Sequence, residues 1–99
     1  MKLIHCFEVP PGREDEFVQG WNRLTKILQG ADGYIGTEFY RKTADVGRFA
    51  FINVAEWRDE EAWRAAVASE IFQAQLELMT DFTGYPGLYE LAYEETAVS

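Results

Sequence analysis

The stretch RFAFINVAEWRDEEAW, residues 48–63, contains the two patterns that set the fold. Its first part, residues 48–57, is an almost continuous apolar run rich in Phe, Ile and Val, which is typical of a strand buried on both faces. Asp59 then offers a helix cap, and Ala62, Trp63, Ala66 and Val67 follow at helical spacing. The stretch therefore predicts a buried strand that leads directly into an amphipathic helix.

Similar patterns continue on both sides of this stretch. Residues 2–9 and 34–42 are rich in β-branched and aromatic side chains and end at turn residues, so both are predicted strands. Residues 13–29 carry an apolar stripe at helical spacing: Phe17, Trp21, Leu24 and Leu28. After residue 63, Ser69 restarts a helical pattern that continues to Phe82, and residues 88–95 alternate as a last strand.

The resulting order is strand, helix, strand, strand, helix, strand. This order is typical of the ferredoxin-like α+β fold, a four-stranded antiparallel sheet with its helices on one face. Residues 1–99 are predicted to form a single domain of this kind. The sheet face without helices would be too large an apolar patch for a monomer, so we expect a homodimer in which two sheets pack as a dimeric α+β barrel.

Composition excludes several classes of partner. The net charge of -8 disfavours nucleic acid and anionic membrane surfaces, and no apolar run is long enough to span a bilayer. The amino end is too short and polar for a signal peptide, and the single Cys fits a reducing compartment, so a cytoplasmic location is expected. One Cys and one His cannot build a structural zinc site. There is also no nucleotide or flavin fingerprint, so we expect no cofactor and no metal.

The segment NVAEWRDEEAW, residues 53–63, resembles the signature of the antibiotic biosynthesis monooxygenase family. Glu8-Val9-Pro10 and the GYIG stretch at residues 33–36 add to this resemblance, which spans residues 2–95. It implies a small dimeric α+β barrel. The activities it implies are cofactor-free oxidation of anthrones and quinols, haem degradation, or isomerisation of a signalling sugar phosphate, and many members have no known activity.

The resemblance also implies roles for individual residues. In the cofactor-free anthrone oxygenases of the family an Asn and a Trp four residues apart line the cavity, and Asn53 and Trp57 have that spacing here. His5 stands where the haem degraders have a functional Asn on their first strand. Those proteins also need a His on the helix after the Trp. No His follows residue 5 in this chain, so haem degradation is not expected.

Strand alternation supports one shared pocket. It places Phe49, Phe51, Asn53, Ala55 and Trp57 on one face of their strand. His5 shares a face of the first strand with Leu3 and Phe7, and the ferredoxin-like order makes these two strands neighbours.

The three polar or aromatic residues of the expected pocket each allow more than one interpretation. Asn53 is either bonded to backbone or a donor to a substrate oxygen, Trp57 is core or cavity wall or both, and His5 is a base or a satisfied core residue.

The sequence thus favours a cofactor-independent monooxygenase that oxidises an aromatic enol, anthrone or hydroquinone-like substrate with dioxygen. The predicted catalytic residues are Asn53, Trp57 and His5, and the predicted substrate-binding residues are Phe51, Trp63, Trp21 and Phe72. One alternative is a non-catalytic dimeric barrel that binds a small hydrophobic ligand. Another is an isomerase of the same fold that acts on a small phosphorylated sugar, which would need a basic site for the phosphate. The spacing of the arginines does not guarantee such a site: Arg41, Arg48, Arg58 and Arg64.

Overall fold

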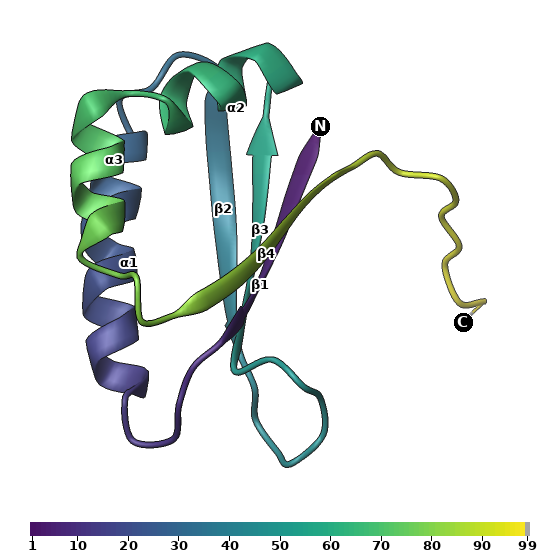
Figure 1. Cartoon of the computed structure of the whole chain (residues 1–99). Coiled ribbons are helices and arrows are strands. Elements are labelled where there is room, and N and C mark those ends of the chain that lie inside the picture. Colours follow the sequence, from purple (N-terminus) through teal and green to yellow (C-terminus); the bar gives the residue numbers. More distant parts are fainter. Residues whose placement is uncertain (99) are drawn as a thin grey trace.

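A computed structural model describes residues 1–98 (Figure 1). The elements follow in the order β1 (Lys2–Glu8), α1 (Glu14–Leu28), β2 (Tyr34–Arg41), β3 (Phe51–Trp57), α2 (Glu60–Val67), α3 (Glu70–Glu77) and β4 (Thr83–Tyr89). The four strands form one antiparallel sheet in the order β2-β3-β1-β4, and the helices lie against one face of it. This is the ferredoxin-like α+β fold that the sequence predicts.

The covered face of the sheet carries the core. Phe17, Trp21 and Leu24 of α1 are buried against it, as the helical stripe predicts. The rings of Phe17 and Phe39 each stack on Phe51 with centroids 5.2 Å apart. A second buried cluster lies around Trp57 and Ala62, where β3 ends and α2 begins. The core therefore has two parts, one at each end of the inner sheet face.

Strand β3 is buried on one face only. Phe51, Asn53, Ala55 and Trp57 are buried, whereas the residues between them are partly exposed. The expectation of burial on both faces is therefore not met within one chain, because all three helices lie on the same side of the sheet. The outer face of β3 is left to solvent or to a partner.

The last strand lies earlier in the sequence than predicted. The prediction of a strand over residues 88–95 is wrong, because β4 spans Thr83–Tyr89 and residues 90–98 form no helix or strand. Pro86 lies inside this strand and pairs with His5. Because β4 is an edge strand, its proline costs no ladder hydrogen bond on the open side.

The start of β3 also differs from the prediction. The strand begins at Phe51 rather than Arg48, and Phe49 lies against Tyr85 of β4, with ring centroids 5.7 Å apart. Tyr85 pairs with Cys6, one residue along from His5, and so lies on the outer face. Phe49 therefore does not share a face with Phe51, because regular alternation starts only where the strand does.

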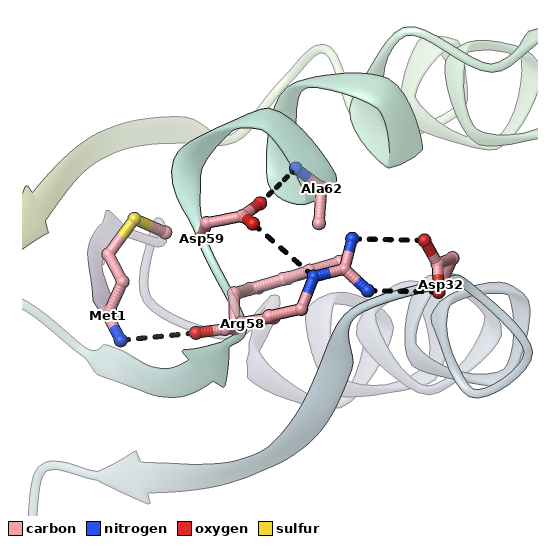
Figure 2. Close-up of polar contacts among 6 residues, drawn as sticks. Met1, Asp32, Arg58, Asp59 and Ala62 are labelled. Carbon is pink, nitrogen blue, oxygen red and sulfur yellow. Dashed lines mark hydrogen bonds and ion pairs between the residues drawn. The ribbon is translucent and has the colours of Figure 1, made fainter.

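A polar cluster holds the junction between β3 and α2 (Figure 2). Asp59 caps α2 by accepting a hydrogen bond of 2.8 Å from the backbone N–H of Ala62, as the sequence predicts. The guanidinium of Arg58 donates to both carboxylate oxygens of Asp32, at 3.1 and 3.0 Å, and to Asp59 at 3.3 Å. At Gly33, φ is +83° and an added Cβ would lie 2.5 Å from that of Ala62. These contacts fix the approach of β2 to the start of α2.

The cap at Asp59 leads to a stability prediction. Asp59→Ala removes the acceptor for the Ala62 N–H and should lower the free energy of unfolding by about 1 kcal/mol. Asp59→Asn keeps a capping oxygen and loses only an exposed ion pair, so its loss should be smaller. Chemical denaturation at one protein concentration measures both values, and equal stability of Asp59→Ala and the parent protein would contradict the role of the cap.

Candidate functional site

A cavity of about 390 Å³ lies between the inner face of the sheet and the helices. Strand residues form one wall, among them His5, Asn53 and Trp57, and the helices supply the other. Every predicted site residue lines this cavity except Phe51, so the structure brings together six side chains: His5, Trp21, Asn53, Trp57, Trp63 and Phe72.

The assignment of Phe51 to substrate binding is not supported by the structure. Its side chain is 1% exposed and packs within the aromatic core between Phe17 and Phe39. Alternation placed it correctly on the inner face of β3. It does not line the cavity because neighbouring rings of the core cover it, whereas Phe17 of the same cluster does border the cavity.

The cavity wall carries no formal charge. In the described part of the chain no Asp, Glu, Lys or Arg side chain lines it, and the polar side chains present are neutral at pH 7: His5, Thr25, Tyr34, Thr37, Asn53, Gln73 and the indoles. Such a wall solvates an ion poorly, because no counter-ion compensates for the water that is lost. The cavity is therefore suited to an uncharged, largely apolar ligand.

Asn53 is the buried amide of this site. It lies on β3 opposite His5 and is 3% exposed. The Thr37 hydroxyl donates a hydrogen bond to its Oδ1. Within residues 1–98 its Nδ2 has no hydrogen-bond partner, so the side chain retains a donor group. Its partner is therefore a side chain, and not the backbone that the sequence interpretation considered.

Trp57 serves as both core and cavity wall. It is 1% exposed, and its ring meets that of Tyr34 edge to face at 5.2 Å. The indole N–H groups of Trp57 and Trp21 are buried without an acceptor in the described residues. Buried donors of this kind are costly when left unpaired. Both rings border the cavity, whereas their N–H groups are themselves buried.

His5 is held in an apolar corner. Its ring packs on Phe7 with centroids 4.1 Å apart and meets Trp21 edge-on at 6.5 Å. Gly84 of β4 leaves room for it, because a Cβ there would lie 2.5 Å from the His5 Nε2. Burial lowers the pKa of His5 to about 4, so the imidazole is neutral at pH 7 and only weakly basic.

The sequence interpretation missed Tyr34 and Thr37, both of which line the cavity. Simple alternation puts residues 34 and 37 on opposite faces of β2. The ladder with β3 has a register shift between Tyr34 and Gly36, and this irregularity brings both side chains inward. The signal in the sequence is the glycine at the start of a strand, which is a common sign of a bulge.

A ferredoxin-like sheet with a largely aromatic, partly open cavity under its helices defines this chain as an α+β domain with a ligand-sized site. The family model for antibiotic biosynthesis monooxygenases matches residues 2–78, and the chain belongs to this family. No curated protein matches it in sequence.

Of the described helices, none is long and apolar enough to cross a membrane. No three His, Cys, Asp or Glu side chains of residues 1–98 form a group that could hold a metal ion.

Solved structures share the fold at low identity. SnoaB, a cofactor-independent oxygenase from Streptomyces nogalater, has a TM-score of 0.80 and 20% identity, covering 94% of this chain and 93% of its own. A candidate monooxygenase from Shewanella loihica PV-4 has a TM-score of 0.78 and 22% identity, and the match covers 94% of each chain. A dimeric ferredoxin-like protein of unknown function from Thermobifida fusca has a TM-score of 0.66 and 17% identity, and the match covers 89% of each chain. At these identities the likeness shows the fold alone.

The burial of His5 predicts a pH dependence of stability. The unfolded chain takes up a proton at this residue near pH 6.5, whereas the native state does so only near pH 4. Native stability should therefore fall as the pH drops from about 6.5 to 4, by on the order of 3 kcal/mol in total. His5→Gln cannot titrate, so denaturation across this range should show a smaller loss than in the parent protein. Parallel stability curves would show that His5 is not desolvated as described.

Proposed function

We propose that the chain is a cofactor-independent monooxygenase that oxidises an aromatic enol, anthrone or hydroquinone-like substrate with dioxygen. The observation that carries this proposal is the uncharged aromatic cavity of about 390 Å³ with Asn53 in its wall. Its volume lies within the usual range of small-molecule sites. Membership of the family supports the proposal, as does the shared fold of SnoaB, itself described as a cofactor-independent oxygenase.

The cavity wall favours a planar, neutral substrate. Trp21, Trp57 and Trp63 offer apolar ring surfaces to an aromatic ligand. A carboxylate or phosphate would enter without a cationic partner, because no arginine or lysine of the described residues lines the cavity. This argues against the alternative of an isomerase that acts on a phosphorylated sugar.

The proposed reaction needs no redox group from the protein. The substrate first loses a proton to give an enolate, which passes one electron to dioxygen. The resulting radical and superoxide combine at the substrate carbon to form a peroxide, which then loses water. In an anthrone the net change converts a CH₂ group and O₂ to a carbonyl and one water. The protein must therefore promote the first deprotonation and hold the ring where oxygen can reach it.

Asn53 is the proposed donor to the substrate oxygen. An amide N–H in a dry site stabilises a developing enolate, and one donor of this type is worth about 3–4 kcal/mol in known oxyanion sites. Trp57 would hold the ring beside it. His5 is a weak proton acceptor here because burial lowers its pKa to about 4, so the acidity of the bound substrate carries most of the deprotonation.

The rival proposal is a non-catalytic dimeric barrel that binds a small hydrophobic ligand. It is favoured by one observation, the lack of a strong base among the described cavity residues. Oxygen uptake with a panel of anthrones and hydroquinones, measured with chelator present and flavin absent, separates the two proposals. We expect uptake that depends on the protein. Quenching of Trp fluorescence by the same compounds without oxygen uptake would favour the binding protein.

Asn53→Ala should lower kcat by about 10²–10³-fold while the protein stays folded, because it removes the donor to the enolate. Trp57→Phe keeps a ring and should cause a milder loss. Trp57→Ala is a poor test, since truncation of a fully buried Trp costs about 3–5 kcal/mol of stability. Steady-state oxygen uptake and circular dichroism measure the two properties. Full turnover of a folded Asn53→Ala variant would show that the assigned site is wrong.

We further propose that the active form is a homodimer joined through the outer sheet face. Half-buried Ile4, Ile52 and Val54 lie at its centre, and no helix covers them. Light scattering should give twice the mass of one chain, because burial of this apolar face favours pairing. Val54→Lys should yield monomers, whereas Val46→Lys, on an 81% exposed loop residue, should not. A monomeric parent protein at micromolar concentration would contradict the dimer.

A further inference from the structure

The direction in which the Asn53 amide points matters to any ligand. The two ends of the side chain have opposite chemistry, since Oδ1 accepts hydrogen bonds and Nδ2 donates them. A donor to a substrate oxygen must present Nδ2 to the cavity. Rotation of the amide by half a turn would present an acceptor instead, which repels an enolate oxygen. Apolar neighbours do not distinguish the two orientations of the amide, so a hydrogen-bonding neighbour is needed to select one of them.

Thr37 supplies that partner from the neighbouring strand. Its hydroxyl lies close to Asn53 Oδ1 and is also 3.4 Å from the carbonyl oxygen of Val54. A hydroxyl has one hydrogen, and the much closer Asn53 oxygen takes it. If the amide were flipped, Nδ2 would donate to the Thr37 oxygen, and the hydroxyl hydrogen would be left with the Val54 carbonyl at 3.4 Å, near the limit of a hydrogen bond. The Thr37 hydroxyl thus favours the orientation in which Nδ2 is left free.

The irregularity in β2 brings a third polar group to this pair. Because the register shifts between Tyr34 and Gly36, Tyr34 lies on the inner face together with Thr37. Burial raises the pKa of the Tyr34 hydroxyl, so it remains a neutral phenol. The partners of the Thr37 hydroxyl are therefore the Asn53 oxygen and the Val54 carbonyl, and Tyr34 adds a neutral polar group to the same part of the cavity wall.

We propose that Thr37 is a positioning residue that locks the Asn53 amide with Nδ2 toward the ligand, which limits the site to ligands that accept a hydrogen bond there. This inference rests on the proposed oxygenase function for its kinetic consequence only. The lock itself is a property of the empty protein. Thr37 acts through Asn53, and its hydroxyl hydrogen is the part that matters.

The first measurement is independent of turnover. The side-chain NH₂ resonances of Asn53, assigned by their loss in Asn53→Ala, should shift and broaden in Thr37→Val, because the amide then samples both orientations. Thr37→Ser keeps the hydroxyl and should retain the parent signals. Thr25→Val is the matched control, since Thr25 lines the same cavity but donates to the carbonyl of Asn22 at 3.0 Å; it should leave the Asn53 signals in place.

The second measurement uses the best substrate of the oxygen-uptake panel. Thr37→Val should lower kcat about tenfold with little change in KM, the loss expected for one hydrogen bond felt mainly in the transition state. Thr37→Ser should restore kcat. If Thr37→Val does not fold, Thr37→Ala serves the same comparison with the serine variant.

The two measurements separate the possible failures. Unchanged Asn53 signals in a folded Thr37→Val or Thr37→Ala protein would overturn the lock, whatever the kinetics show. A shift of those signals in a protein that oxidises nothing in the panel would support the lock and count against the oxygenase. Equal kcat values for the parent and valine proteins, on a substrate that needs Asn53, would overturn the positioning role.

Discussion

The pairing of β1 with β3 at the centre of the sheet is the constraint on which the other features depend. Its register sets His5 opposite Asn53 and Phe7 opposite Phe51. Because alternate residues of both strands face the helices, this single register selects the aromatic core and the polar residues of the cavity together. A shift by one residue would turn Asn53 outward and expose the face that now packs on α1. The site is therefore fixed by the same hydrogen-bond ladder that holds the fold.

A buried amide in such a core would normally destabilise it unless a partner were present. Here the partner depends on a local departure from regular structure. The register shift in β2 turns Thr37 toward Asn53 while Tyr34, nearer the strand's start, also faces inward. Polar groups are thus concentrated where β2 meets β3. The opposite end, around Phe17 and Phe51, is a cluster of packed apolar side chains. Asn53 therefore borders the cavity, whereas Phe51 is covered by its neighbouring rings.

The sequence predicts the regular parts of this arrangement and misses the irregular ones. The order of elements, the inward face of Asn53 and Trp57, and the caps at Asp59 and Ser69 all follow from spacing that the structure respects. The last strand was misplaced because Gly84 to Gly87 suggest a turn, and only the position of β4 at the sheet edge makes them compatible with a strand. The role of Thr37 was missed because a strand irregularity changes which residues share a face, and simple alternation contains no information about it.

A neutral cavity also limits how the protein can promote a reaction. Placing a carboxylate beside His5 would raise its pKa and make it a better base, but the charge would be costly in a wall of Trp and Phe side chains. The chain instead keeps the imidazole neutral, with its pKa lowered to about 4 by burial. Under the proposed function, acceleration would come from stabilising the anion formed on the substrate, a task that uncharged N–H donors perform well in a site shielded from water. The burial that weakens His5 as a base would, in the proposed reaction, strengthen Asn53 as a donor, and so favour hydrogen bonding to the substrate over general-base catalysis.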